Sequence, residues 1–271
     1  MKIIDFHTHI YPDKIAGKAA DSIAEFYRLK GDGLVGSVDN LLKLEKEAGV
    51  SQAAVLPVAM KPGQTHHVNE FIQKTTREHD NLIGFGTVHA AMEDLLEEGQ
   101  YLIDNGYRGI KIHPDMQQFP IDDLRLYPFY DLIQGKLPIL FHMGDSRFNY
   151  SNPVKLRIIM DKFPRLTCIA AHLGGLDMYD IAYDNFRDKD CCLDISSVLR
   201  FSPPEEVLKW IRTYGAERMI FGTDFPLWNP VHEVKTFQSL GLTDRELEQV
   251  GHQTAERILS LTEKKKIRPD C

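Results

Sequence analysis

The sequence lacks any hydrophobic run long enough to cross a membrane. No stretch of its 271 residues approaches the roughly 18 consecutive apolar residues that suggest a membrane-spanning helix. The chain passes from Met1 and Lys2 directly into an apolar pattern, without the small-residue cleavage site of a signal peptide. We therefore expect a cytoplasmic protein with no membrane-bound segment.

Cysteine is also scarce, and the 32 basic residues are outnumbered by 39 acidic ones. The four cysteines, two of them adjacent at Cys191 and Cys192, do not form the spacing of a disulfide framework, which again favours the cytoplasm. The net charge of −7 argues against binding to nucleic acid or to anionic membranes. The basic cluster at 264–266 is predicted to be a solvated helix end. We expect a small-molecule substrate as the partner and leave homo-oligomer formation open.

Repeats, low-complexity segments and linker-like stretches are absent as well, which favours a single domain over residues 1–271. The chain instead alternates between short apolar runs and helical patterns, as parallel strands joined by helices do. Its length fits the roughly 250 residues of an eight-stranded (β/α)8 barrel. The predicted strands are 2–7, 53–58, 82–88, 108–113, 137–142, 166–172, 191–195 and 218–223. The predicted helices are 12–28, 39–48, 67–79, 92–105, 121–134, 153–163, 177–187, 204–214 and 243–262.

Four of these strands end in side chains that bind metals or transfer protons. The first strand leads into His7 and His9, the fifth ends at His142, the sixth at His172, and the eighth leads into Asp224. His7 and His9 are two residues apart on an extended strand, so both side chains face the same side. Functional groups of a parallel barrel gather at the C-terminal ends of its strands. We therefore expect one metal-centred hydrolytic site at that end.

Histidine nitrogens and a carboxylate oxygen suit one divalent metal ion, in the first place Zn²⁺, with a coordination position left for water. Mn²⁺ and Fe²⁺ can use the same donors. We assign His7, His9, His142 and Asp224 as candidate ligands. Asp224 can also accept a proton from metal-bound water, while His172 orients that water or a substrate oxygen. The alternative for His172 is a core histidine bonded to a backbone carbonyl.

Five short motifs surround these residues: Asp5-Phe6-His7-Thr8-His9, Gly109-Ile110-Lys111-Ile112-His113-Pro114, Phe141-His142-Met143-Gly144-Asp145, Ala171-His172-Leu173-Gly174-Gly175 and Phe221-Gly222-Thr223-Asp224-Phe225-Pro226. Together they resemble the amidohydrolase superfamily, and within it the amidohydrolase-related branch that includes aminocarboxymuconate-semialdehyde decarboxylase. The resemblance extends from residue 3 to about residue 262. It implies a distorted (β/α)8 TIM barrel with one divalent metal, usually zinc, held by the four candidate ligands, and a catalytic His172. It selects no substrate, because the branch contains hydrolases, decarboxylases and a hydratase.

The fourth predicted strand leaves a second metal ion open. Lys111 and His113 are two residues apart and face the same way. Many two-metal members of the superfamily carry a carboxylated lysine at the end of this strand, so Lys111 can in principle bridge two metals. The branch with His-Pro at this point is usually mononuclear. We therefore expect one metal, with Lys111 paired to an inner carboxylate such as Asp5.

Substrate contacts are less clearly marked. His113 can form a pocket wall or have a structural role, and Tyr11 closely follows the His-x-His pair. Arg147 and Arg200 follow the fifth and seventh strands. Either guanidinium can bind a substrate carboxylate in bidentate fashion or remain at the surface.

We expect a metal-dependent hydrolase of a small amide, ester or lactone, in which metal-bound hydroxide attacks the carbonyl. The alternative is a non-oxidative, metal-dependent decarboxylase of an aromatic or unsaturated acid, in which a protonated site residue returns a proton to carbon. A catalytically silent binding protein fits less well, because Asp224 and His172 form a proton-transfer pair beside the predicted ligands.

Overall fold

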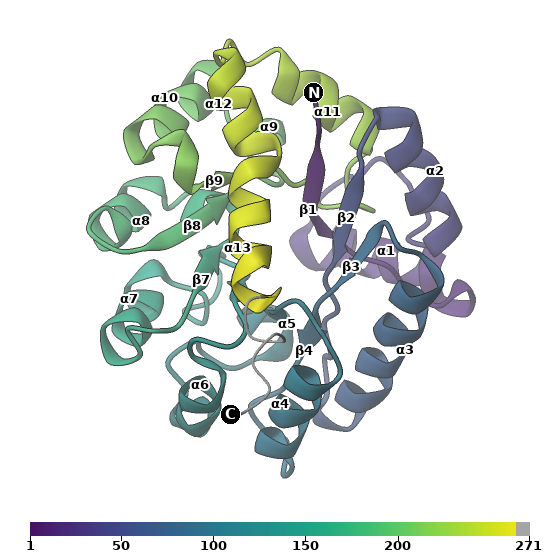
Figure 1. Cartoon of the computed structure of the whole chain (residues 1–271), viewed down its shortest axis with the longest axis vertical. Helices are drawn as coiled ribbons and strands as arrows, with labels where there is room; N and C mark the ends of the chain where they lie inside the picture. The colour runs from purple at the N-terminus through teal and green to yellow at the C-terminus, as the bar shows by residue number, and fades with distance from the viewer. Residues whose placement is uncertain (264–271) are drawn as a thin grey trace, which may run out of the picture.

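Eight parallel strands form a nearly closed barrel surrounded by helices in the computed structural model, which describes residues 1–263 (Figure 1). Hydrogen-bonded neighbours follow chain order in two sheets, β1-β2-β3 and β4-β5-β6-β7-β8-β9. β3 and β4 are two halves of the third barrel strand, separated by Phe85. The predicted TIM barrel is therefore confirmed. The strands are β1 (Ile4–Thr8), β2 (Gln52–Val55), β3 (Leu82–Gly84), β4 (Gly86–Thr87), β5 (Ile110–Ile112), β6 (Ile139–Phe141), β7 (Cys168–Ala170), β8 (Cys191–Asp194) and β9 (Met219–Ile220).

The helices lie mostly where the sequence predicts them. The helix expected over 121–134 is shorter, because Pro128 fits only the first turn of a helix. The helices are α1 (Asp13–Tyr27), α2 (Val38–Ala48), α3 (Thr65–Glu78), α4 (Leu95–Asp104), α5 (Pro114–Gln117), α6 (Tyr127–Ile133), α7 (Pro153–Lys162), α8 (Tyr179–Phe186), α9 (Val198–Phe201), α10 (Pro204–Tyr214), α11 (Pro230–Gln238), α12 (Asp244–Glu248) and α13 (Thr254–Glu263). Single 3₁₀ turns lie at Pro62–Gln64, Leu124–Leu126, His172–Gly174 and Ala216–Arg218, and a π-helical turn, Gln249–Gln253, joins α12 to α13.

Helix α13 packs against the barrel at the N-terminal ends of the strands. It crosses the ring of strands in Figure 1, and its Ala255 and Ile258 belong to the same buried cluster as Phe6, Leu140 and Ile169. These inward-facing apolar side chains fill the barrel interior. Function is therefore confined to the opposite, C-terminal end of the strands.

A register shift in β1 determines which of its side chains face the interior. The pairing with β2 shifts between Asp5 and Thr8, as it does at a β-bulge. Phe6 therefore joins the interior cluster while the next residue, His7, also faces inward. Asp5 accepts hydrogen bonds from Thr223 instead of facing the interior beside His7.

The barrel closes between β9 and β1 through a small number of backbone contacts. The N–H of Phe6 donates to the carbonyl of Phe221 at 2.9 Å, and Thr8 forms an isolated parallel bridge with Phe225. The N–H of Asp224 donates to the carbonyl of His7 at 2.7 Å. This junction brings the end of the eighth strand directly to the end of the first.

Within residues 1–263, no helix is both long and apolar enough to cross a membrane. The basic cluster at 264–266 lies outside the described residues. The prediction of a single domain over 1–271 likewise extends beyond them and stays a prediction.

Candidate metal centre and substrate cavity

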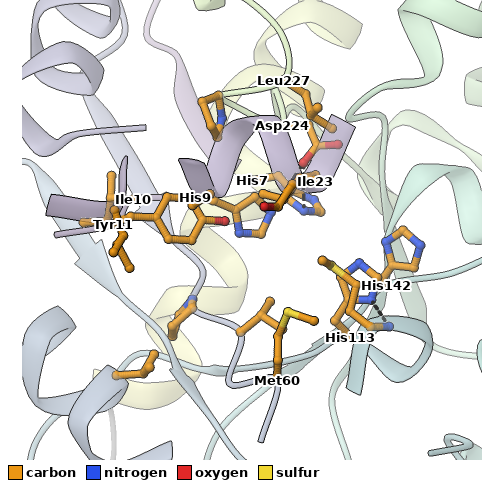
Figure 2. A pocket seen from close by; sticks show the side chains of 18 of the residues that line it. His7, His9, Ile10, Tyr11, Ile23, Met60, His113, His142, Asp224 and Leu227 are labelled. Carbon is orange, nitrogen blue, oxygen red and sulfur yellow. Dashed lines mark hydrogen bonds and ion pairs between the residues drawn. The ribbon is translucent and has the colours of Figure 1, made fainter. Parts of the chain in front are cut away.

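A cavity of about 560 Å³ opens at the C-terminal ends of the barrel strands. Helix α1, inserted after β1, contributes a large part of its wall. The segment over 29–38 contributes Leu29. All the predicted ligands and the predicted catalytic histidine line this cavity together with His113: His7, His9, His113, His142, His172 and Asp224. Figure 2 shows His7, His9 and Asp224 close together, with His113 and His142 nearby.

His7, His9 and Asp224 form a compact group of donors. One ligand atom of each lies within 4.8 Å of the others. The Nε2 atoms of His7 and His9 lie 3.6 and 3.4 Å from Oδ1 of Asp224. Nδ1 of His9 lies 2.6 Å from the carbonyl oxygen of Leu56, which can only accept a hydrogen bond. Nδ1 therefore carries the hydrogen, and a singly protonated ring keeps its Nε2 lone pair toward the cavity.

Asp194, at the end of β8, orients His7 in the same way. Its Oδ2 lies 2.8 Å from Nδ1 of His7, while Oδ1 accepts from the N–H groups of His172 and Ser196. Burial alone would raise the pKa of Asp194, but His7 and the other partners hold it well below its ordinary value. A buried carboxylate behind a ligand histidine is a common feature of metal sites. The sequence analysis missed Asp194, although it lies one residue before the end of the predicted strand 191–195.

The protonation states at this site suit metal binding. Burial is the main cause that lowers the pKa of His7 to about 4, and burial likewise lowers the pKa of His142 well below its ordinary value. Burial acts in the opposite direction on Asp224, but His7 and His9 hold the pKa of Asp224 well below its usual range. Neutral imidazoles and an ionised carboxylate are the forms that bind metals.

His172 and Asp224 both adopt the left-handed backbone conformation, with φ of 58° and 65°. Side chains other than glycine rarely adopt it, at a cost of about 1–3 kcal/mol each, and such residues cluster at functional sites. Here the conformation is held by hydrogen bonds. The N–H of His172 donates to Asp194, and the N–H of Asp224 donates to His7.

A chain of hydrogen bonds links four aromatic side chains at the floor of the cavity. Nδ1 of His172 lies 2.8 Å from the carbonyl of Ser196, so it carries a hydrogen and leaves Nε2 to accept from Nδ1 of His142 at 3.1 Å. Nε2 of His142 then accepts from the hydroxyl of Tyr27 at 3.2 Å. That hydroxyl also lies 2.6 Å from Nε2 of His113. The Nε2 lone pair of His142 is therefore directed into the cavity, like those of His7 and His9.

Tyr27, the last residue of α1, was not predicted from the sequence. Burial raises the pKa of Tyr27 well above its ordinary value, so the hydroxyl keeps its proton and donates. Its acceptor is His142, because Nδ1 of His113 already accepts from the N–H of Met116 and Nε2 of His113 is left to donate.

His142 belongs to a second group of donors rather than to the first. Ligand atoms of His113, Asp115 and His142 lie within 4.8 Å of one another, and the His113 and His142 rings stack at 3.9 Å between centroids. Burial raises the pKa of Asp115 to about 7. His142 as a ligand of the same ion as His7, His9 and Asp224 stays a prediction.

Lys111 lies beside the cavity-facing nitrogen of His7. Its buried Nζ is 3.1 Å from Nε2 of His7, and burial lowers its pKa to about 8. The register shift in β1 turns Asp5 toward Thr223, which explains why Lys111 contacts His7 rather than that carboxylate.

The two arginines considered as substrate contacts lie outside the cavity wall. Arg147 forms a bidentate pair with Asp145 and donates to the carbonyl of Phe26, while Arg200 pairs with Glu233 and Asp32. Tyr11, in contrast, lines the cavity. Among the described lining residues, the positively charged or titratable nitrogens are those of Lys18 and the histidines.

The donor set thus fits one divalent metal ion, because the nitrogens of His7 and His9 and an oxygen of Asp224 converge and the opposite ring nitrogens are bonded. A family model described as Amidohydrolase matches residues 4–261. A search of curated proteins gave no match.

Solved structures with the same fold cover nearly the whole chain. A 2,6-dihydroxybenzoate decarboxylase bound to 2,6-dihydroxybenzoate is 18% identical, with a TM-score of 0.78 and coverage of 96% of this chain and 99% of that one. A dihydroxybenzoic acid decarboxylase from Polaromonas, with manganese and 2-nitroresorcinol, is 15% identical, with a TM-score of 0.76 and 99% coverage of both. A putative 2-pyrone-4,6-dicarboxylic acid hydrolase from Pseudomonas putida is 17% identical, with a TM-score of 0.68 and coverage of 96% and 97%. At these identities the similarity establishes the shared fold.

Proposed function

Because this chain belongs to the amidohydrolase family, we propose that it is a metal-dependent decarboxylase of a small aromatic acid. The observation that carries the proposal is that His7, His9 and Asp224 lie on the polar floor of a cavity whose lining is mainly apolar. Such a cavity suits an aromatic ring. Exclusion of water favours loss of a charged carboxylate as neutral CO₂. The decarboxylases among the similar structures support this reaction over the hydrolysis that the sequence favoured.

The residues of the site have separate roles in the proposed reaction. A divalent ion held by His7, His9, Asp224 and His142 would balance the negative charge of the substrate's carboxylate and an adjacent oxygen. This charge balance falls to the ion because Arg147 and Arg200 are paired outside the cavity. The bond between ring and carboxylate breaks with its electrons left on the ring carbon.

Asp224 and His172 form the proton-transfer pair. Because Asp224 is ionised in the free site, the pair first takes up a proton from solvent, and the ring carbon takes that proton as CO₂ leaves. Tyr27 donates a hydrogen bond to His142 at the same floor. Tyr11 and His113 line the part of the cavity that would hold the aromatic ring of the substrate.

The experiment distinguishes the two reactions. Metal-loaded protein is incubated in ¹⁸O-labelled water with 2,6-dihydroxybenzoate, with related hydroxybenzoates and with 2-pyrone-4,6-dicarboxylate. We expect CO₂ release without ¹⁸O in the organic product. Ring opening of the pyrone with ¹⁸O incorporation and no CO₂ would establish the hydrolase instead.

Asp224→Asn tests the assigned role. We expect CO₂ release to fall by about 100-fold or more, the scale of a lost general acid or base. Asp104→Asn, which alters an exposed carboxylate on α4, is the matched control and should leave the rate unchanged. Elemental analysis should give one divalent ion per chain, Zn²⁺ or Mn²⁺. Two ions per chain would favour a bridging Lys111.

A further inference from the structure

The cavity has a polar floor and apolar walls. Its histidines, Asp224 and the Tyr27 hydroxyl gather at one end, around the candidate metal centre. The walls come from α1, α3, α9 and the segments after β1, β2, β7 and β9. Their side chains are mainly aliphatic or aromatic: Ile10, Ile15, Ile23, Val58, Met60, Val68, Phe71, Leu176, Phe201 and Leu227. The polar lining residues away from the floor, Lys18, Ser22, Gln64 and His67, are exposed to solvent. A ligand that fills the cavity therefore meets buried polar partners at one end only.

The apolar lining continues to the surface. Ile15 is 49% exposed, Met60 49% and Phe201 43%, although each is a large hydrophobic side chain that lines the cavity. They come from three separate segments of the chain, so their exposure is not a property of one element. The volume of about 560 Å³ falls well inside the range of about 300–1,000 Å³ that holds drug-sized ligands. It leaves room beyond a single aromatic ring.

The basic side chains that line the cavity away from its floor are exposed to solvent rather than buried. Lys18 lines it but is exposed, and the side chain of His67 is 84% exposed. Arg147 and Arg200 are each bonded to carboxylates of the protein. A second carboxylate on the ligand would therefore be desolvated against apolar walls without a counter-charge, which is strongly unfavourable.

We propose that the cavity is selective for aromatic acids that carry one carboxylate, held at the floor, and a bulky apolar substituent opposite it that extends toward the mouth. The position of the carboxylate rests on the proposed function. The apolar part rests on the walls alone. Dicarboxylic aromatic acids are excluded as good ligands.

The first experiment measures binding rather than turnover. Isothermal titration calorimetry on the zinc-loaded protein compares 2-hydroxybenzoates with hydrogen, methyl, propyl, pentyl or carboxylate at position 4, opposite the carboxylate. Each buried methylene should strengthen binding by about two- to fourfold. The 4-carboxylate should bind at least about tenfold more weakly than the 4-methyl compound. Equal affinities along the alkyl series, or tighter binding of the dicarboxylate, would overturn the proposal.

The second experiment introduces a cation into the wall. Val68 is half-buried on α3 and lines the cavity, so Val68→Arg should strengthen binding of the 4-carboxylate and weaken binding of the 4-pentyl compound. Val154→Arg makes the same change at a 47% exposed position on α7 and should alter neither affinity. An unchanged preference in a folded Val68→Arg protein would contradict the inference.

Release of CO₂ is measured separately on the same compounds. If the alkyl series binds as expected and no compound loses CO₂, the decarboxylase proposal fails and the selectivity stands. If CO₂ is released and the dicarboxylate is preferred, the selectivity fails and the decarboxylase stands.

Discussion

The candidate ligand histidines all have the ring nitrogen that faces away from the cavity bonded to an acceptor. For His9 the acceptor is Leu56, for His7 it is Asp194, and for His142 it is His172. Nε2 of His7, which faces the cavity, lies 3.1 Å from Nζ of Lys111. The inward nitrogen of His142 is bonded to a neighbouring hydroxyl, that of Tyr27. A metal ion that binds Nε2 of His142 must displace this hydrogen bond.

Tyr27→Phe should therefore bind Zn²⁺ more tightly than the wild type. The removed bond contributes about 0.5–1.5 kcal/mol, which corresponds to an increase in affinity of about two- to tenfold. Competition with a chelating dye measures the dissociation constant directly.

Tyr179→Phe provides the control for the Tyr27 variant. It removes a hydroxyl that is bonded to Ser202 away from the cavity, and should leave zinc affinity unchanged. Equal affinities of the Tyr27→Phe and wild-type proteins would mean that His142 does not bind the ion.

Site residues at strand ends could be predicted from the sequence because each follows directly after a buried apolar run. His7, His9, His142, His172 and Asp224 all line one cavity, as that reasoning requires. Asp194 obeys the same rule, but Cys191-Cys192-Leu193 is a short run that drew no attention to its end. Tyr27 could not be found this way. It ends a helix, and its distance from His142 depends on how α1 packs over the barrel.

An arginine from the segment after β6 contacts the C-terminal end of helix α1. Nη1 of Arg147 donates to the carbonyl of Phe26 at 2.5 Å, its guanidinium lies 4.9 Å from the Phe26 ring, and Asp145 fixes its orientation. Arg147 thus positions the end of α1, next to Tyr27, without lining the cavity.

Arg147→Met should increase the mobility of α1. We expect faster amide hydrogen exchange over residues 19–28 and a higher KM, with exchange in the barrel strands unchanged. Arg157→Met removes comparable ion pairs and a carbonyl contact on α7 and should leave α1 unaffected. Unaltered exchange in α1 would show that the contact with Phe26 does not hold the helix.

The strands were predictable because their burial on both faces produces continuous apolar runs, as in Pro138–Phe141 and Leu166–Ala171. The contribution of α1 to the cavity wall was not predictable from the sequence. Its inward-facing residues, such as Ile15 and Ile23, form the same amphipathic pattern as a helix that packs on a core. The register shift in β1 was also unpredictable, because an extended pattern of Asp5, His7 and His9 places all three on one side.

Stability of the whole molecule depends on a buried pair of carboxyl groups between α2 and β1. Burial, and then the neighbouring Asp5, raise the pKa of Glu45 well above its ordinary value of 4.5. The folded protein therefore holds a proton that the unfolded chain releases. The associated stability is fully present below about pH 4.5 and is lost as pH rises through the folded-state pKa.

Glu45→Gln keeps the shape of the protonated side chain and removes the titration. Relative to the wild type, we expect its melting temperature to rise as the pH increases above about 4.5 and to level off once the pH passes the folded-state pKa of Glu45. Glu47→Gln, on the exposed face of the same helix, is the control. Its melting temperature should differ from that of the wild type by the same amount at every pH. Calorimetry that finds a constant difference between Glu45→Gln and the wild type would mean that Glu45 is charged in both states.

The junction between β9 and β1 has a further consequence for the metal. His9 and Asp224 lie on opposite sides of it and are separated by about 200 residues of chain. An ion bonded to both would be a cross-link, and closing a loop of that length restricts the unfolded chain by about 5 kcal/mol in chain-entropy terms. Removal of the ion by a chelator would then lower the stability of the barrel as well as abolish catalysis. Divalent ions that bind both residues but do not support turnover should therefore still raise the melting temperature.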